Sequence, residues 1–248
     1  MTAPAIVARD LDVGYDGEIV LRSISFEVQE GEVFAILGGS GSGKTTLLRA
    51  LIGLLPPMSG TLEVLGQDLA SAGTGRRRVL LRSMGVLFQT GALFADMTLA
   101  ENVMLPIRVQ TDLPESTARV LACIKLAQVG LCGDEELLPS QISGGMRKRA
   151  GIARAMALDP RILVLDEPSS GLDPVTASDL DRLIRVLNSS LGITVVMVTH
   201  DMASALAVAG RCILIDRETR GIRAEGVPRE LRDHHPDPHV RAFFRRAA

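Results

Sequence analysis

A glycine-rich run near the N-terminus holds the residue types and the spacing best suited to chemistry. Residues 38–45 read Gly-Gly-Ser-Gly-Ser-Gly-Lys-Thr and fit the pattern G-x-x-x-x-G-K-[ST]. Glycines let successive backbone N–H groups turn toward an anion, and the N-terminus of a following helix favours negative charge. An apolar run at 33–37 precedes this loop, and a helix-like stretch at 44–54 follows it. This context predicts a phosphate-binding loop rather than a plain glycine-rich turn before a helix.

We expect the loop to hold the β- and γ-phosphates of ATP through its backbone, with two side chains in defined roles. Lys44 supplies a positive point charge, and Thr45 supplies a hydroxyl for Mg²⁺. The residues expected to contact the nucleotide here are Gly38, Gly39, Ser40, Gly41, Ser42, Gly43, Lys44, Thr45 and Thr46. ATP and Mg²⁺ are therefore the expected cofactors.

Two adjacent carboxylates, Asp166 and Glu167, follow an apolar run at 161–165 that we expect to be a buried strand. If the strands are parallel, this strand ends on the same side of the sheet as the phosphate loop. Asp166 would then meet the metal, directly or through water, and Glu167 would polarise the water that attacks the γ-phosphate. Acidic pairs also occur as caps and turns, so the prediction depends on the loop found earlier in the chain.

His200 closes another apolar run, 193–199, and the other three histidines all lie beyond residue 233. A histidine at the carboxyl end of a parallel strand lies at the edge where open α/β sheets bind ligands. We therefore expect His200 to contact the γ-phosphate and Glu167, as a second catalytic residue. The alternative is a helix-capping or buried histidine.

Ser143, Gly144 and Gly145 precede a helix-like stretch at 146–158 and form a second candidate phosphate site. One nucleotide has one triphosphate, which the first loop already holds. The economical interpretation is that this second helix N-terminus serves the ATP of a partner chain. In isolation, the same three residues would indicate only an N-cap and a turn.

The remaining pattern predicts an α/β fold with a mostly parallel sheet. Apolar runs recur at 33–37, 84–88, 161–165, 193–198 and 211–215, separated by helical or loop stretches. Alternation of apolar and polar residues at 24–29 predicts a small N-terminal antiparallel β layer. No strand is expected between Gln89 and Gln141, where a capping box at Thr98–Glu101 and a helical pattern at 114–129 indicate an inserted helical sub-lobe.

Length and composition favour one domain of this kind. The chain has 248 residues, 46% of them hydrophobic, and no apolar run approaches a bilayer span of about 18 residues. We expect residues 1–248 to form a single soluble domain, with a core at 1–89 and 155–225, a helical sub-lobe at about 90–154 and a C-terminal tail at 226–248. The three cysteines show no metal or disulfide spacing and are expected to be buried reduced thiols. A net charge of −2 gives no general reason to expect nucleic-acid binding.

Together these motifs resemble the nucleotide-binding subunits of ABC transporters, with a P-loop NTPase core, over nearly the whole chain. The resemblance implies that Tyr15 stacks on adenine and that Gln89 contacts both nucleotide and metal. It identifies 142–146 as the signature loop and places 170–173 at a dimer interface. Ile142 and Met146 replace the usual leucine and glutamine of the signature, but the backbone donors and the Ser143 hydroxyl remain.

Two stretches, 87–102 and 143–154, further resemble the Mla-type ATPases, which energise lipid traffic between the membranes of bacteria with an outer membrane. This resemblance implies a homodimer at the cytoplasmic face of the inner membrane. It also implies an integral membrane permease of Mla type, a periplasmic Mce lipid-binding protein and often a small STAS-domain protein. The segment after Gln89, with Leu93, Phe94 and Met97, is expected either to receive a permease helix or to pack the sub-lobe.

Three alternatives are open, the first within the same class of transport ATPases and the other two in different classes. The ATPase of a polar amino-acid importer would share much of this region and a similar C-terminal segment. A soluble ATPase that acts on nucleic acid or ribosomes would carry a long coiled coil or a second ATPase domain, and this chain shows neither. A catalytically silent regulator would not require Lys44, Glu167 and His200 together.

Overall fold

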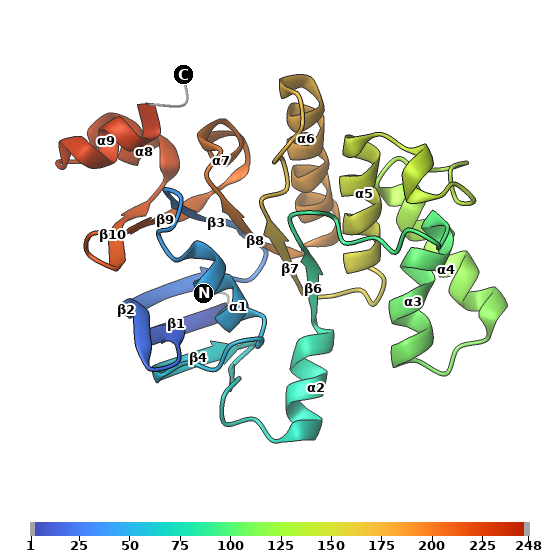
Figure 1. Cartoon of the computed structure of the whole chain (residues 1–248), viewed down its shortest axis with the longest axis horizontal. Coiled ribbons are helices and arrows are strands. Elements are labelled where there is room, and N and C mark those ends of the chain that lie inside the picture. Colours follow the sequence, from blue (N-terminus) through green and yellow to red (C-terminus); the bar gives the residue numbers. More distant parts are fainter. Residues whose placement is uncertain (1–2, 246–248) are drawn as a thin grey trace.

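The apolar runs expected to be strands form five of the six strands of one sheet, and most of their side chains are buried. In β3 (Val33–Gly38), Ala35 belongs to one hydrophobic core and Ile36 to the other. Burial on both faces is typical of parallel strands. The computed structural model, which describes residues 3–245, orders this sheet as β10-β9-β3-β8-β7-β6 (Figure 1).

Parallel pairing joins β9 to β3, β3 to β8, β8 to β7 and β7 to β6, whereas β10 pairs antiparallel with β9. These strands are β6 (Met84–Leu87), β7 (Ile162–Asp166), β8 (Thr194–Thr199), β9 (Arg211–Asp216) and β10 (Gly221–Gly226). The carboxyl ends of β3, β6, β7 and β8 consequently lie at one edge of the sheet. Open α/β sheets bind their ligands at this edge.

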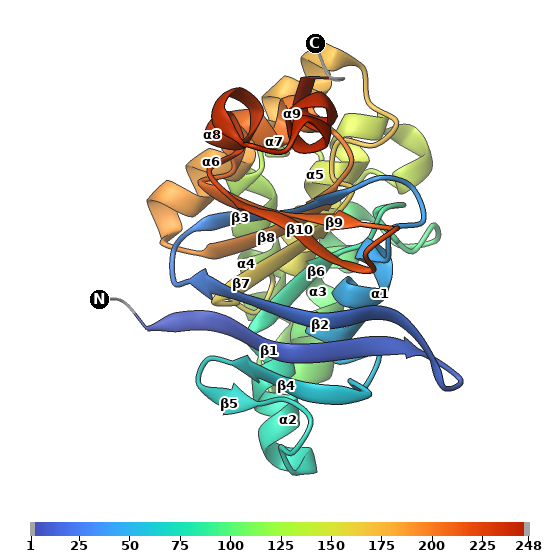
Figure 2. The ribbon, with the colours of Figure 1, turned by 90° about the vertical axis from the view of Figure 1, so that its left-hand side faces the viewer.

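A second, antiparallel sheet confirms the expected N-terminal layer and is larger than expected. Its order is β2-β1-β4-β5, with β1 (Pro4–Tyr15), β2 (Glu18–Gln29), β4 (Ser59–Val64) and β5 (Gln67–Asp68). In β2, Phe26 and Val28 are buried while Glu27 is exposed, as the alternation predicted. Figure 2 shows this layer on the side of the central sheet opposite to helices α6–α9.

The helices divide between the two faces of the central sheet. The buried side chains of α1 (Lys44–Leu51) and α2 (Thr74–Arg82) belong to the core shared with the N-terminal sheet. Those of α5 (Gly144–Ala155), α6 (Pro174–Leu191) and α7 (Met202–Val208) belong to the core on the other face. The N-termini of α1 and α5, both predicted to bind phosphate, therefore belong to helices on opposite faces.

The region expected to be a helical sub-lobe contains α3 (Leu99–Gln110), α4 (Glu115–Gln128), the 3₁₀ helix η1 (Pro139–Gln141) and α5. The predicted capping box is present, because the side chains and backbones of Thr98 and Glu101 bond reciprocally. Asn102 is fully buried and its amide bonds the backbone of Phe94 and Met97. These bonds fix the loop that leads from the central sheet into α3.

The segment beyond Gly226 is folded, which corrects the expected tail. It forms α8 (Pro228–His234) and α9 (Pro238–Arg245). Val240 and Phe244 stand one helical turn apart on α9 and are 0% and 1% exposed, within the core that also holds α7. Burial of this apolar stripe makes 228–245 part of the domain. The last three residues of the expected tail lie outside the described residues.

Within residues 3–245, every helix is too short or too polar to cross a bilayer. The three cysteines are free thiols, but only Cys212 is buried, and burial raises its pKa to about 12. Cys123 is half-buried, and Cys132 is exposed in the turn that follows α4. The expectation of three buried thiols is therefore wrong.

Candidate active site

The phosphate loop connects the end of β3 to the start of α1, as the motif predicts, and its glycines are required by the geometry. Gly41 and Gly43 have φ values of 71° and 101°, in the region that favours glycine. A Cβ at Gly43 would stand 2.8 Å from the Leu21 side chain. A Cβ at Gly38 would stand 2.6 Å from the carbonyl oxygen of Ile215. The loop can follow this path only with glycine at these positions.

Lys44 is 8% exposed and its ammonium group donates to the carbonyl oxygens of Gly38 and Gly39, at 2.8 and 3.0 Å. Burial lowers the pKa of Lys44, while the carboxylates Glu167 and Asp166 oppose that shift. A nucleotide phosphate is an acceptor that could take over these donors. The loop thus holds a buried cation at the place where the motif predicts a triphosphate.

The Ser42 hydroxyl is a second sign that the loop is built for an anion. Its oxygen is buried and has no hydrogen-bond partner among the described residues. Because buried polar groups are nearly always paired, this donor is available to a phosphate oxygen. Ser40, Thr45 and the backbone of Gly39 are exposed beside it. These groups fit the phosphates of ATP.

The oxygen donors expected for Mg²⁺ lie on three different elements. Thr45 is an exposed residue of α1, Asp166 ends β7, and Gln89 is exposed just beyond β6. Burial, followed by the Glu167 charge, raises the pKa of Asp166, and Lys148 and Lys44 lower it. Hydroxyl, carboxylate and amide oxygens are the hard ligands that Mg²⁺ prefers, so the residues fit the ion. When bound, Mg²⁺ would neutralise phosphate charge.

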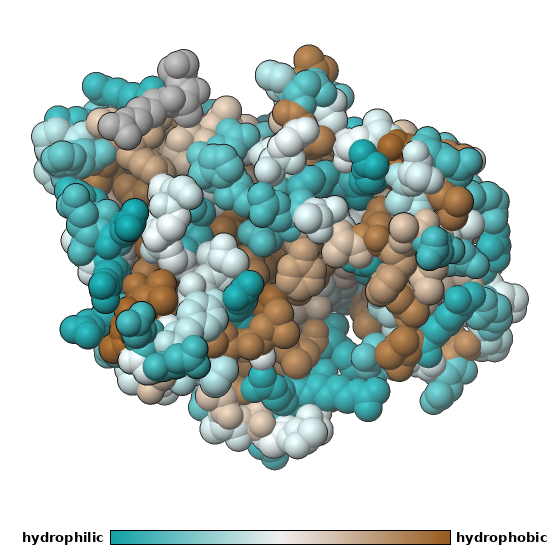
Figure 3. Space-filling model, in the orientation of Figure 1, coloured by the Kyte–Doolittle hydropathy of each residue, from teal (hydrophilic) through white to brown (hydrophobic). Residues whose placement is uncertain are grey.

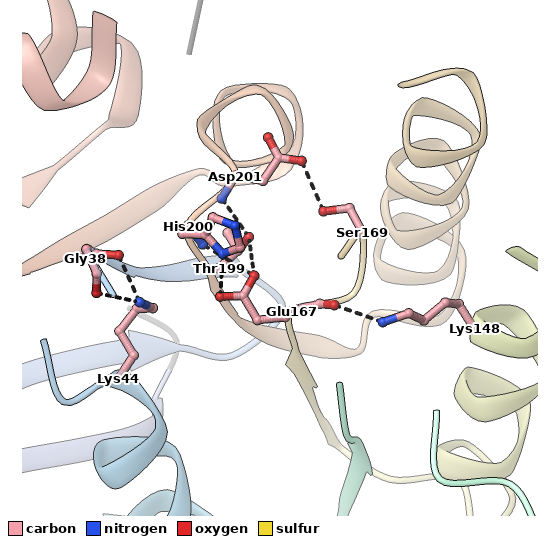
Figure 4. A network of polar contacts seen from close by, with 9 residues as sticks. Gly38, Lys44, Lys148, Glu167, Ser169, Thr199, His200 and Asp201 are labelled. Atoms are coloured by element: carbon pink, nitrogen blue, oxygen red, sulfur yellow. Dashed lines mark hydrogen bonds and ion pairs between the residues drawn. The ribbon is translucent and has the colours of Figure 1, made fainter. Parts of the chain in front are cut away.

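Glu167 and His200 meet at the carboxyl ends of β7 and β8 (Figure 4). The Glu167 Oε1 atom lies 2.8 Å from His200 Nδ1, and Oε2 accepts from the Thr199 hydroxyl at 3.2 Å. Glu167 is 9% exposed, whereas the His200 side chain is 64% exposed. Asp201, rather than His200, caps α7 through the N–H groups of its first turn. His200 is thus neither buried nor a cap, and it contacts Glu167 as predicted.

Lys148 is a neighbour of this pair that the motifs did not reveal. It lies in the second turn of α5 and donates to the carbonyl oxygens of Gln89 and Glu167, at 2.6 and 3.0 Å. Ser169 is another such neighbour, since its hydroxyl donates to Asp201 at 3.0 Å. The only sequence signal for Lys148 is a charged residue on a helix face otherwise occupied by Gly145, Ile152 and other buried residues.

Tyr15 ends β1 and is 37% exposed. Arg49 of α1 donates to its hydroxyl oxygen at 3.0 Å, and the guanidinium carbon lies 6.0 Å from the ring centroid. The aromatic ring is thereby tied to the helix that begins at the phosphate loop. Stacking of adenine on Tyr15 stays a prediction.

The signature segment forms a helix N-terminus, as predicted, but it is not brought to the phosphate loop of the same chain. Ser143 caps α5, and its hydroxyl oxygen accepts from the Met146 N–H at 3.2 Å. Ser143 and Gly144 are exposed, while Gly145 packs against Thr176. Figure 1 shows α5 and α1 separated by strands of the central sheet. The two expected phosphate sites of one chain are therefore distinct.

Comparisons with known proteins agree with this geometry. The family model described as ABC transporter matches residues 21–170. The chain is 41% identical over 237 residues to the intermembrane phospholipid transport system ATP-binding protein MlaF of Escherichia coli K12, covering 95% of this chain and 87% of that protein. It is 39% identical over 240 residues to the probable ribonucleotide transport ATP-binding protein mkl of Mycobacterium leprae, covering 97% and 68%.

A solved structure gives the same fold. The dimeric, post-hydrolysis structure of the ATP-binding cassette MJ0796 bound to ADP and Pi matches with a TM-score of 0.79 and 28% identity, covering 90% of this chain and 98% of that one. A family match over more than half of the chain, near-complete relatives and an assembled phosphate loop lead to one conclusion. This protein is an ATP-hydrolysing member of the ABC transporter family.

Proposed function

We propose that this chain is the ATPase subunit of a transporter that moves phospholipids between the inner and outer membranes of a bacterium. The contact between Glu167 and His200 beside the phosphate loop carries the ATPase part of the proposal. The lipid part rests on the 41% identity to a relative named for intermembrane phospholipid transport. The relatives found here do not favour the polar amino-acid importer considered from the sequence.

Hydrolysis by this site depends on how the chain holds a water and a phosphate. Backbone N–H groups of the loop and the Lys44 ammonium bind the β- and γ-phosphates. The Glu167 carboxylate orients the water and takes its proton as the oxygen attacks phosphorus and ADP leaves. The His200 ring and the Thr199 hydroxyl hold that carboxylate by its two oxygens, which fixes its direction.

The chain works as a homodimer in this proposal. In one chain α1 and α5 pack on opposite faces of the sheet and are separated by its strands, so we do not expect one triphosphate to contact both N-termini. Two copies arranged head to tail bring Ser143 and Gly144 of one to the ATP held by the other. The dimeric structure of the ATP-binding cassette MJ0796 supports this assembly.

A groove between α2 and α3 supports a permease partner at the cytoplasmic face of the inner membrane. Its volume is 580 Å³, and its walls include Leu81, Leu105, Pro106 and Val109. Figure 3 shows apolar surface on both sides of this hollow. An apolar groove of this size can receive one short helix of an integral membrane protein.

The segment after Gln89 offers the permease one further exposed apolar side chain. Phe94 is 51% exposed, and the Arg154 guanidinium lies 5.9 Å from its ring centroid. Leu93, in contrast, is partly buried and packs against the core, so it has a structural role. We assign Phe94 to the permease contact. A periplasmic Mce lipid-binding protein and a small STAS-domain protein complete the proposed system.

A complementation experiment tests the lipid assignment. In a strain that lacks this protein, the Glu167→Gln variant should fail to restore resistance to detergent, because phospholipid transport that supports the outer-membrane barrier would stop. Glu218→Gln, which removes an exposed carboxylate, serves as the matched control and should restore resistance. If the strain that carries Glu167→Gln shows normal detergent resistance together with defective uptake of a polar amino acid or a ribonucleotide, the lipid assignment is overturned.

A further inference from the structure

The Lys148 side chain is buried in an unusual environment. The residue is 6% exposed, and both hydrogen bonds of its ammonium group among the described residues go to main-chain carbonyl oxygens, of Gln89 and Glu167. Figure 4 shows it reaching from α5 to the Glu167 backbone. A buried ammonium is costly unless it is paired and hydrogen-bonded. Helix packing alone would be served equally well by a neutral side chain.

The two carbonyl groups that Lys148 contacts belong to residues just beyond the ends of β6 and β7. The β7 strand ends at Asp166 and the β6 strand ends at Leu87, so Glu167 and Gln89 lie outside the ladder of the sheet. Both residues have side chains that the sequence assigned to the ATP site. Lys148 thus joins the backbones of two site residues, each just beyond the end of one of two neighbouring strands, to a single point on α5.

Glu167 needs such support because its backbone is strained. Its φ is 47°, in the left-handed region that non-glycine residues rarely adopt. On one side its N–H donates to the carbonyl oxygen of Val198 at 2.8 Å, and on the other its carbonyl accepts from Lys148. The peptide groups on both sides of the Glu167 Cα are therefore held. The direction of its carboxylate toward His200 depends on this backbone.

We infer that Lys148 is a positioning residue that connects the signature helix to the catalytic glutamate of its own chain. The inference rests on the proposed dimer, in which the N-terminus of α5 binds the ATP held by the partner chain. A shift of α5 on binding that ATP moves Lys148, and with it the Glu167 and Gln89 backbones. Lys148 thereby couples the occupancy of one ATP site to hydrolysis at the other.

The test compares three variants of the full-length chain purified with its membrane partners. Lys148→Met keeps an unbranched apolar stem and removes the charge and the donors of the side chain. Lys148→Arg keeps a cation that can reach both carbonyls. Arg149→Met is the matched control on the same helix, because Arg149 donates to the Val129 carbonyl, in the turn that follows α4. ATP turnover, ATP affinity and the thermal midpoint are measured for each.

Lys148→Met should lower kcat by roughly tenfold or more, with ATP affinity and thermal midpoint close to those of the wild type, since it misplaces a catalytic group. The Hill coefficient for ATP should fall toward one, because the two sites no longer communicate. Lys148→Arg should restore both, and Arg149→Met should resemble the wild type. If Lys148→Met does not fold, it is replaced by Lys148→Gln, whose uncharged side chain is one atom shorter than that of lysine.

A wild-type kcat and Hill coefficient in Lys148→Met, or in the Lys148→Gln variant that replaces it, would overturn the inference. An equal loss of kcat, ATP affinity and thermal midpoint that arginine does not rescue would also overturn it, by showing a purely structural role. The proposed lipid function fails separately, if the wild-type complex hydrolyses ATP without moving phospholipid. Failure of the wild-type chain to form an ATP-dependent dimer would remove the basis of the inference.

Discussion

In the proposed mechanism, the residues of the site divide into groups that bind the nucleotide in its ground state and groups that act on the attacking water. Lys44 belongs to the first class, because its ammonium already lies within the phosphate loop. Glu167 belongs to the second, because its carboxylate is held by His200 and Thr199. These two classes should respond differently to substitution.

We expect Lys44→Ala to abolish ATP binding and Glu167→Gln to retain binding and lose turnover by about 100-fold or more, since only the latter leaves all phosphate contacts in place. Equilibrium binding of a fluorescent ATP analogue and a phosphate-release assay measure the two quantities. An equal loss of nucleotide affinity in both variants would show that the roles are assigned wrongly.

The residues of the candidate site could be predicted where a recognisable run of residues stands directly beside them in the sequence. The phosphate loop, Asp166, Glu167 and His200 each follow an apolar run that identifies the strand before them. Lys148 could not be predicted, because its partners are backbone carbonyls 59 and 19 positions away. Backbone partners carry no side-chain signature in a sequence.

Among helices and strands, those with the most buried apolar residues were the ones that the sequence predicted. The central strands were predicted because they are apolar on both faces, as β7 and β8 show. The edge strand β10 reads Gly-Ile-Arg-Ala-Glu-Gly and has one buried residue, so it has no such pattern. Helix α9 was predicted to be a tail because it contains a proline and several charged residues. Only two of its side chains, Val240 and Phe244, are buried in the core.

The contact between α6 and α7 contains a buried carboxyl group that should make stability depend on pH. Asp181 is 6% exposed and accepts from the Ser204 hydroxyl. Burial is the main cause that raises the pKa of Asp181, and the charge of Asp201 raises it further. The hydrogen bond from Ser204 and the charge of Arg185 lower this pKa by less. Above the pKa of about 3.9 that Asp181 has in the unfolded state, the folded state therefore binds this proton more strongly than the unfolded state does. Stability from this group falls as pH rises from that value through the folded pKa.

Asp181→Asn should consequently raise the thermal midpoint at pH 7, and the gain should disappear as pH falls toward about 4. A stabilisation on the order of 1 kcal/mol corresponds to roughly 2–4 °C in a domain of this size. Asp179→Asn, whose side chain is 46% exposed on the same helix, is the control and should have little effect. A lower midpoint for Asp181→Asn at pH 7 would show that the ionised carboxylate is favourable.

In the whole molecule, the helix that follows the phosphate loop and the helix that carries the signature segment lie on opposite faces of the central sheet. One face carries α1 and the N-terminal sheet, and the other carries the signature helix α5 and the rest of the helical sub-lobe. A second copy is needed to complete each ATP site in the proposed dimer. The sequence predicted a dimer only because the chain has two candidate phosphate sites and one ATP molecule has a single triphosphate. No local sequence pattern describes the dimer interface itself.

In the proposed dimer, ATP brings the phosphate loop of one chain to the signature segment of another. Spin labels at Glu18, near the phosphate loop, and at Ser140, near the start of α5, report this separation when they are placed on different chains. The native cysteines are replaced, and Glu167→Gln preserves bound nucleotide. We predict a new short-distance population on addition of ATP and Mg²⁺ that is absent in the Lys44→Ala chain. A distance distribution unchanged by ATP would contradict the proposed dimer.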